Sequence, residues 1–222
     1  MHDASTAELA VALILASLRG IDDFARAAPT GRWLHGPRAA LADRQVLILG
    51  YGSVGAAVER RLAGFEVDVV RVSRTARSDP AGPVHGVDEL PSLLGSADVV
   101  VVCVPLTTET IGLVDAQFLS RMSDGALLVN IARGLVVDTE ALVPEVCSGR
   151  LRAALDVTEP EPLPPGHPLW SAPGVLISPH VGGNTSAFLP RATTLLAQQL
   201  SRFASGRPLL NVVRHGSRRL PP

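Results

Sequence analysis

The chain alternates short apolar segments with segments whose apolar residues recur at helical spacing. Several of the apolar segments are hydrophobic on both faces, which is typical of strands buried between two layers of helices. Such alternation favours an α/β fold with a doubly wound parallel sheet of the Rossmann type and helices on both faces. We expect strands at 45–49, 67–72, 98–104, 126–131, 152–157 and 175–178, and helices at 7–18, 53–63, 88–94, 115–121, 138–148 and 185–203.

Local signals place some of the boundaries. Ser5 or Thr6 is the expected N-cap of the first helix, with Glu8 in its first turn. The apolar run in this helix is shorter than the ~20 residues that span a bilayer and lacks a preceding basic region, so a buried helix is expected. Pro144 falls inside a predicted helix, which it should kink or end.

Composition excludes several classes of function. The 222 residues carry a net charge of −1, so neither nucleic acid nor an anionic membrane is an expected partner. All 20 basic residues are arginine, which excludes a Schiff-base lysine and a P-loop lysine. The two cysteines are too few for a disulfide framework, so a cytoplasmic setting is expected. No spacing of His, Cys, Asp or Glu indicates a metal site.

A glycine turn, Gly50-Tyr-Gly52-Ser-Val-Gly55, follows the first expected strand and opens a helix. Gly50 permits the tight turn, Gly52 lets the backbone approach a pyrophosphate, and Gly55 lets the helix pack on the strand. The amides near Ser53 and Val54 lie at the positive end of that helix and would bind phosphate oxygens. The alternative is an ordinary strand–helix turn. The context predicts a dinucleotide site.

The end of the second strand indicates which dinucleotide is bound. An NAD-preferring site has an acidic residue there, which accepts hydrogen bonds from the ribose. This chain has Ser73, followed by Arg74 and, close by, Arg77. An uncharged residue removes repulsion, and arginine can bind a 2′-phosphate with two hydrogen bonds. The pattern favours NADP(H), with NAD(H) possible; the alternative is a solvated basic loop.

Polar residues follow three later strands. Arg133 and His180 each come directly after an apolar run, Asp156 ends its own strand, and Glu161 lies in a proline-rich loop. Each alone is more often structural, but in an open parallel sheet these ends converge on one crevice. There arginine can bind a carboxylate, histidine can carry a proton, and a neighbouring carboxylate can stabilise the imidazolium. Asp156 would bond the nicotinamide amide or the local backbone.

Together these features resemble the D-isomer-specific 2-hydroxyacid dehydrogenase family, which includes glyoxylate/hydroxypyruvate reductases and phosphoglycerate dehydrogenases. The resemblance extends from about Ala7 to Val213 and includes the glycine turn, Pro105-Leu-Thr-Thr-Glu-Thr110, Asn130-Ile-Ala-Arg-Gly-Leu-Val-Val-Asp138, Leu155-Asp-Val-Thr-Glu-Pro-Glu-Pro-Leu-Pro164 and Ser178-Pro-His-Val-Gly-Gly183. It implies that Arg133 holds the substrate, that His180 is the acid/base, and that Glu161 tunes His180. It implies coenzyme contacts at Gly50, Gly52, Ser53, Val54, Gly55, Ser73, Arg74, Thr75, Val104, Pro105, Thr110, Ile131, Ala132, Arg133, Asp156, His180, Gly182 and Gly183.

The resemblance also divides the chain. Residues 1–26 would form an interface helix of the cofactor domain, residues 27–184 the NAD(P)-binding Rossmann domain, and residues 185–222 a helix and tail that return to a substrate lobe in relatives. Most of that lobe has no counterpart in this sequence, which is compatible with a truncated form, a fragment or a natural short form. Because the corresponding helix in the family packs across a two-fold axis, and because 7–18 is apolar on nearly every face, a homodimer is expected.

The leading hypothesis is an oxidoreductase that transfers a hydride between NADP(H) and a small 2-oxo or 2-hydroxy acid. The alternative is a catalytically weak or inactive nucleotide-binding module of such an enzyme. An unrelated short-chain reductase is disfavoured, because its Tyr-x-x-x-Lys pair requires a lysine.

Overall fold

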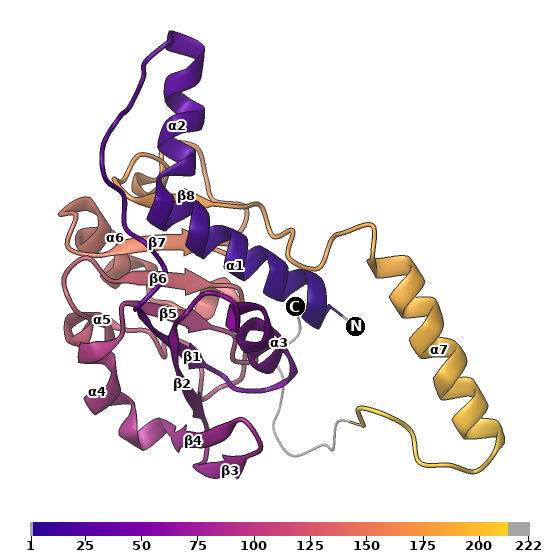
Figure 1. Cartoon of the computed structure of the whole chain (residues 1–222). Coiled ribbons are helices and arrows are strands. Elements are labelled where there is room, and N and C mark those ends of the chain that lie inside the picture. The colour runs from indigo at the N-terminus through magenta and orange to yellow at the C-terminus, as the bar shows by residue number, and fades with distance from the viewer. Residues whose placement is uncertain (1, 213–222) are drawn as a thin grey trace.

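One eight-stranded sheet, in the order β3-β4-β2-β1-β5-β6-β7-β8, organises the molecule (Figure 1). In the computed structural model, which describes residues 2–212, neighbouring strands are parallel except for the antiparallel pair β3–β4. The predicted parallel sheet is therefore confirmed. Its strands are β1 (Gln45–Leu49), β2 (Asp68–Ser73), β3 (Arg77–Asp79), β4 (Gly82–Gly86), β5 (Val99–Val102), β6 (Leu127–Asn130), β7 (Arg152–Leu155) and β8 (Val175–Ile177).

Helices cover both faces of this sheet. They are α1 (Asp3–Arg19), α2 (Ile21–Ala27), α3 (Ser53–Leu62), α4 (Leu90–Leu93), α5 (Ala116–Arg121), α6 (Thr139–Cys147) and α7 (Phe188–Ala204), with short 3₁₀ turns at Ala28–Thr30, Val87–Glu89, Leu94–Ser96, Gly134–Val136 and Pro168–Trp170. Successive residues of a strand pack into two different hydrophobic cores, because side chains in a strand point alternately to the two faces of the sheet. Val99 and Val101 of β5 join the core under α1 and α3, while Val100 and Val102 join the core under α4, α5 and α6.

The chain reverses its direction of travel across the sheet between β1 and β5. It passes from β1 to β2 on one side and later returns to place β5 on the other side of β1. In open α/β sheets, ligands bind in the crevice at the carboxyl ends of the strands where this reversal occurs. The glycine turn after β1 lies at that point.

Helix α1 begins earlier than the sequence predicts. His2 precedes the first helical residue and makes no capping bond through its side chain. The prediction of Ser5 or Thr6 as the N-cap is wrong, because the Ser5 hydroxyl donates to the His2 carbonyl at 3.3 Å inside the helix. The apolar residues of α1 pack within the chain, against α3 and the sheet, and those in the core are Ala7, Ala10, Val11, Leu13, Ile14 and Leu18.

The structure also differs from the predicted elements at two places: the expected interface helix of residues 1–26 divides at Gly20 into α1 and α2, and a hairpin forms where a loop was expected. Helix α2 follows Gly20, and the β3–β4 hairpin pairs Arg77 with Val84 beside the end of β2. These segments are too short to show a hydrophobic period. The expected break at Pro144 does not occur, since α6 continues to Cys147; a proline there removes a single helical hydrogen bond.

Helix α7 projects away from the layered body (Figure 1). None of its residues is buried, and Leu189, Leu196, Leu200 and Phe203 are each at least 59% exposed. Residues 213–222 of the predicted tail lie outside the described residues. Within 2–212 no single helix is long and apolar enough to cross a membrane, and the bent pair of Asp3–Arg19 and Ile21–Thr30 meets that test by length and composition only.

Candidate functional site

The predicted site residues follow the carboxyl ends of six neighbouring strands, which are β2, β1, β5, β6, β7 and β8. Because parallel strands end at the same edge of a sheet, the loops after them share one side of the molecule. The glycine turn follows β1, Arg133 follows β6, Glu161 follows β7, and His180 follows β8. No group of three or more His, Cys, Asp or Glu side chains within 2–212 is arranged to hold a metal ion.

Each glycine of the turn has a distinct geometry. Gly50 has a φ of +103°, and a Cβ there would lie 2.7 Å from the backbone of Cys103 and Val104. A Cβ on Gly55 would lie 2.8 Å from the Gly50 carbonyl oxygen, whereas nothing lies within 4 Å of the corresponding position on Gly52. The turn is thus tightly packed behind and open in front, which suits backbone approach to a pyrophosphate. The amides of Ser53 and Val54 begin α3 beside this open space.

Arg77 is the cation held against the end of β2. Its guanidinium donates to Ser73 Oγ at 2.6 Å and to the Tyr51 carbonyl at 2.7 Å, while Ser73 Oγ donates to the Thr75 carbonyl at 2.7 Å. Arg74 is exposed and has no such bonds. The sequence named Arg77 only as a neighbour, because the β3–β4 hairpin that returns it to Ser73 was not predicted.

Tyr51 supports this corner. Its ring lies beneath the guanidinium groups of Arg71, at 5.7 Å, and Arg77, at 5.9 Å, and its hydroxyl bonds to Glu59. Glu59 also bonds to the Arg71 guanidinium. Although burial opposes ionisation, the hydrogen bonds from Arg71 and Tyr51 hold the pKa of the Glu59 carboxyl below its usual value. The glycine turn, α3 and β2 are therefore tied together at the point where a ribose would lie.

Other predicted coenzyme contacts have local roles. Thr110 Oγ1 donates to the Pro105 carbonyl at 2.7 Å and accepts from the Thr107 amide at 2.8 Å, which closes the turn after Val104. Ile131 and Ala132 are buried, one in each of the two cores. Contact of these residues with a coenzyme stays a prediction.

Asn130 and Gly134 shape the loop that carries Arg133, and the sequence assigned neither a role. Asn130 Oδ1 accepts from the Ala132 amide at 3.0 Å, and its Nδ2 donates to the Arg133 carbonyl at 3.1 Å. A Cβ on Gly134 would lie 1.9 Å from the carbonyl oxygen of Thr158, which precedes Glu161. The sequence signal that could have indicated this role is a polar residue, Asn130, at the end of an apolar strand. Arg133 itself is exposed, with Nη1 donating to the Ala132 carbonyl at 2.7 Å.

Asp156 anchors the loop that carries His180. Its carboxylate accepts from the Ser178 hydroxyl at 2.6 Å and from the amides of Val181 and Gly182, both at 2.9 Å. The residue is 3% exposed. The sequence left two roles open for Asp156, a bond to the nicotinamide amide or bonds to the local backbone. The bonds to the local backbone are present in the structure. His2 Nδ1 also lies 3.3 Å from the Gly183 carbonyl, against the same loop.

His180, in the loop after β8, pairs with Glu161, in the loop after β7. Its Nδ1 lies 2.6 Å from Glu161 Oε1, and the two side chains are 43% and 40% exposed. His180 has a φ of +53°, and its amide donates to the Asp156 carbonyl at 2.8 Å. With Nδ1 bonded to the carboxylate, Nε2 is the ring nitrogen left for another molecule. The pair can therefore hold or deliver a proton at Nε2.

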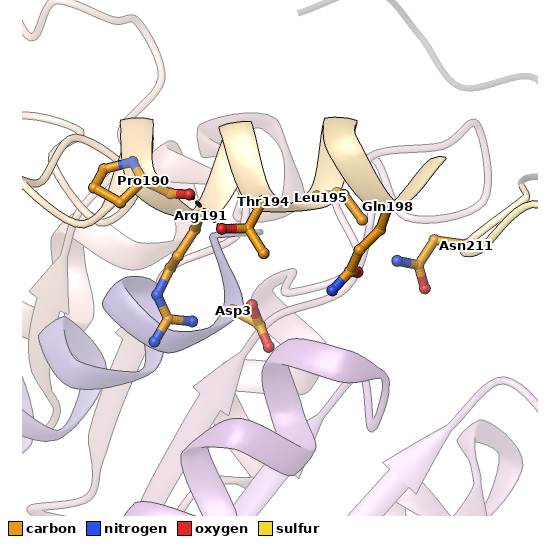
Figure 2. Close-up of a pocket in the computed structure, with 7 residues that line it drawn as sticks. All are labelled: Asp3, Pro190, Arg191, Thr194, Leu195, Gln198 and Asn211. Atoms are coloured by element: carbon orange, nitrogen blue, oxygen red, sulfur yellow. Dashed lines mark hydrogen bonds between the residues drawn. The ribbon is translucent and has the colours of Figure 1, made fainter. Parts of the chain in front are cut away.

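One cavity lies apart from these residues. It has a volume of about 320 Å³ between the start of α1 and one face of α7, where Asp3 faces Arg191, Thr194 and Gln198 (Figure 2). No predicted site residue lines it.

Comparisons with known proteins agree with this arrangement. The model of the D-isomer specific 2-hydroxyacid dehydrogenase NAD binding domain matches residues 11–182. A glyoxylate reductase from Thermofilum pendens is 37% identical over 213 residues, which cover 91% of this chain and 62% of that protein. A human glyoxylate reductase/hydroxypyruvate reductase is 34% identical over 213 residues, with coverage of 92% and 65%. The chain thus spans less than two thirds of these relatives.

Solved structures show the same fold. A D-isomer specific 2-hydroxyacid dehydrogenase from Xanthobacter autotrophicus, in complex with NADPH and MES, has a TM-score of 0.83 and 38% identity over 96% of this chain and 88% of that one. An NADPH-dependent glyoxylate/hydroxypyruvate reductase from Sinorhizobium meliloti, in complex with NADP and sulfate, has a TM-score of 0.83 and 29% identity over 94% of this chain and 67% of that one. This chain belongs to the D-isomer-specific 2-hydroxyacid dehydrogenase family and contains its NAD-binding domain.

Proposed function

We propose that this chain binds NADP(H) and takes part in hydride transfer between that coenzyme and a small 2-oxo or 2-hydroxy acid. The observation that carries the proposal is the 2.6 Å contact between His180 Nδ1 and Glu161 Oε1 at the edge of the sheet that also bears the glycine turn. Solved relatives in complex with NADPH and NADP support the choice of coenzyme.

The chemistry divides among three side chains. The nicotinamide, when bound, supplies or accepts the hydride. Arg133 binds the substrate carboxylate through its planar guanidinium, which also polarises the adjacent carbonyl. His180 delivers a proton from Nε2 to the carbonyl oxygen, or removes it in the reverse direction. Glu161 fixes the ring through Nδ1 and stabilises the imidazolium while the proton is held.

The coenzyme preference rests on Ser73 and Arg77. Neither opposes a 2′-phosphate, and the Arg77 guanidinium is already held beside Ser73 Oγ at 2.6 Å. Because few degrees of freedom remain to be lost on binding, this arginine is a better phosphate ligand than a freely moving one. Arg74 is the second expected contact, with Thr75 contributing through its backbone.

Titration with each coenzyme tests this preference. NADPH should bind the chain more tightly than NADH, and Arg77→Ala should weaken NADPH binding roughly tenfold to a hundredfold through loss of a charge-assisted contact. The same substitution should leave NADH affinity nearly unchanged. Arg60→Ala, at an exposed position of α3, is the matched control. Equal affinities for the two coenzymes in the unsubstituted chain would refute the preference.

Turnover tests the catalytic roles. With glyoxylate or hydroxypyruvate as substrate, His180→Ala should lower kcat by about 10²–10⁴-fold, the usual contribution of general acid–base catalysis. Glu161→Gln should lower kcat less, because it keeps a hydrogen-bond partner and removes only the charge. His35→Ala, at an exposed histidine outside the site, should change neither kcat nor KM. Near-normal turnover by the His180 variant would contradict the assignment.

The second candidate is a nucleotide-binding module with little or no turnover. It is favoured by the exposure of the His180 and Glu161 side chains, 43% and 40%, and by the exposed apolar face of α7. A site that is open to water loses much of its catalytic power. Saturable NADPH binding without NADPH oxidation identifies this alternative, whereas family-typical turnover excludes it.

A homodimer in the cytoplasm is part of the same proposal. Helix α1 uses most of its apolar surface within the chain, so the exposed residues beside it carry the argument. Ile21 is 53% exposed, Phe24 37% and Trp33 92%. A second copy that packs against α1, α2 and the following segment would remove this surface from water.

A further inference from the structure

A second cavity lies near the amino-terminal ends of the strands, whereas the glycine turn lies at their carboxyl ends. It has a volume of about 280 Å³ and lies between the end of α1, the start of α2, the segment 37–39 and the residues that begin β7 and β8. Arg152 is the first residue of β7, and Gly174 directly precedes β8. Parallel strands begin at the edge opposite their carboxyl ends, so this cavity is separate from the proposed coenzyme site.

Two arginine side chains line the cavity. Arg152 donates from Nη2 to the Ser17 carbonyl and, among residues 2–212, has no carboxylate within ion-pair distance. Burial lowers the pKa of its guanidinium, the nearby charges of Asp22 and Asp23 raise it, and the charge of Arg38 lowers it. Arg38 lies over the Phe24 ring at 5.2 Å and contacts Asp23 at 3.4 Å. A half-buried guanidinium with one carbonyl partner retains donors that an oxyanion could satisfy.

Glycines seat both arginines. Gly20 has a φ of +65°, and a Cβ there would lie 3.1 Å from Arg38 Nε. Gly174 has a φ of +69°, and a Cβ there would lie 3.2 Å from Arg152 Cγ. A larger residue would press on the Arg38 guanidinium at the first position and on the Arg152 side-chain stem at the second, so both arginine side chains pack against glycine backbone.

Two carboxylates, Asp22 and Asp23, also line the cavity. Arg26, which does not line it, bonds to both, at 2.8 Å and 2.9 Å. The lining therefore carries two arginines and two carboxylates, and both carboxylates already have Arg26 as a partner. The Ser17 hydroxyl, also on the lining, is buried and has no hydrogen-bond partner among the described residues. A buried polar group without a partner is uncommon.

We propose that this cavity binds a small anion through carboxylate or phosphate oxygens held between Arg38 and Arg152. Guanidinium groups bind such oxygens in pairs, with charge-assisted hydrogen bonds. The site is independent of the proposed coenzyme and substrate contacts, and its occupant would bridge α1 and α2 to the start of β7.

Calorimetric titration with inorganic phosphate, and separately with malonate, tests the proposal at constant ionic strength. Both titrations use the chain with Arg77→Gln and Arg133→Gln, so that anions bind less at the coenzyme edge. On this background at least one anion should bind saturably at millimolar concentration. Arg152→Gln and Arg38→Gln should each weaken that binding by at least tenfold, roughly the contribution of one charge-assisted hydrogen bond.

Arg121→Gln, at an exposed position of α5, is the matched control and should leave binding unchanged. Stronger binding of phosphate would identify the site as one for phosphate esters, and stronger binding of malonate as one for organic acids. Because Arg38 is 33% exposed, its variant should fold even if the Arg152 variant does not. Absence of saturable binding, or equal binding by the Arg38 variant, would overturn the proposal. The proposal would also be overturned if a carboxylate from a second copy of the chain occupied the cavity. Light scattering would reveal this as a change of oligomeric state in the Arg38 variant.

Discussion

At the scale of single residues, the loop that carries His180 depends on Asp156. One buried carboxylate accepts from a hydroxyl and two amides, and these bonds join the end of β7 to the segment after β8. The loop also holds His180 at a φ of +53°, a conformation that a histidine rarely adopts without support. The proposed acid/base residue is therefore positioned by a carboxylate that supports its loop and need not contact substrate.

Asp156→Asn should destabilise the chain by about 1–3 kcal/mol, because one carboxylate acceptor becomes a donor that faces the Val181 or Gly182 amide. Urea denaturation followed by far-UV circular dichroism measures the change. Asp124→Asn, at a side chain that is 87% exposed, should have almost no effect. A stability of the Asp156 variant within error of the parent would show that these bonds do not hold the loop.

At the scale of elements, the loops after β6 and β7 are joined at Gly134. The Thr158 carbonyl approaches so closely that a Cβ would lie 1.9 Å from it. This contact keeps the segment after Arg133 against the segment that leads to Glu161. The two side chains proposed to handle substrate and proton thus share one rigid support.

Gly134→Ala should force these loops apart and cost about 1–3 kcal/mol or more, as overpacking of a dense site does. Gly64→Ala adds the same methyl group where nothing lies within 4 Å, so it should leave the chain as stable as the parent. Thermal unfolding of both variants makes the comparison. If the chain turns over, kcat should fall in the Gly134 variant only. Equal melting temperatures for the two variants would contradict the close packing.

At the scale of the whole molecule, apolar surface is concentrated at two projections. One is the exposed face of α7, and the other is the region around α2 and Trp33. The layered body between them buries its own apolar residues in two cores. Exposed patches of this kind mark contact surfaces. The second projection carries the proposed homodimer.

Light scattering at micromolar concentration should show a dimer, whose interface should bury well over ~1,000 Å². Trp33→Ser should shift the equilibrium towards monomer because it removes a large apolar side chain that is 92% exposed in the single chain. Trp170→Ser, at a tryptophan that is 55% exposed on another part of the surface, should not. A stable monomer of the parent chain would remove the dimer from the proposal.

The sequence alone determined the order and type of the main elements, because strands buried on two faces require apolar residues throughout and the helices between them show their own period. It also predicted the geometry of the glycine turn, since Gly50 and Gly55 occupy positions where a Cβ meets backbone. Their roles with a coenzyme, like those of Arg133 and His180, stay predictions.

Only the tertiary structure decided which polar groups meet. The return of Arg77 to Ser73 required the β3–β4 hairpin, and the bonds of Asp156 required β7 and β8 to be neighbours in register. Likewise, α1 has apolar residues on nearly every face because α3 and the sheet cover them within one chain. The physical reason is that hydrophobic periodicity depends on residues close together in the sequence and so indicates only local secondary structure. The contacts described here join residues far apart in the chain, and only the packing of the elements brings them together.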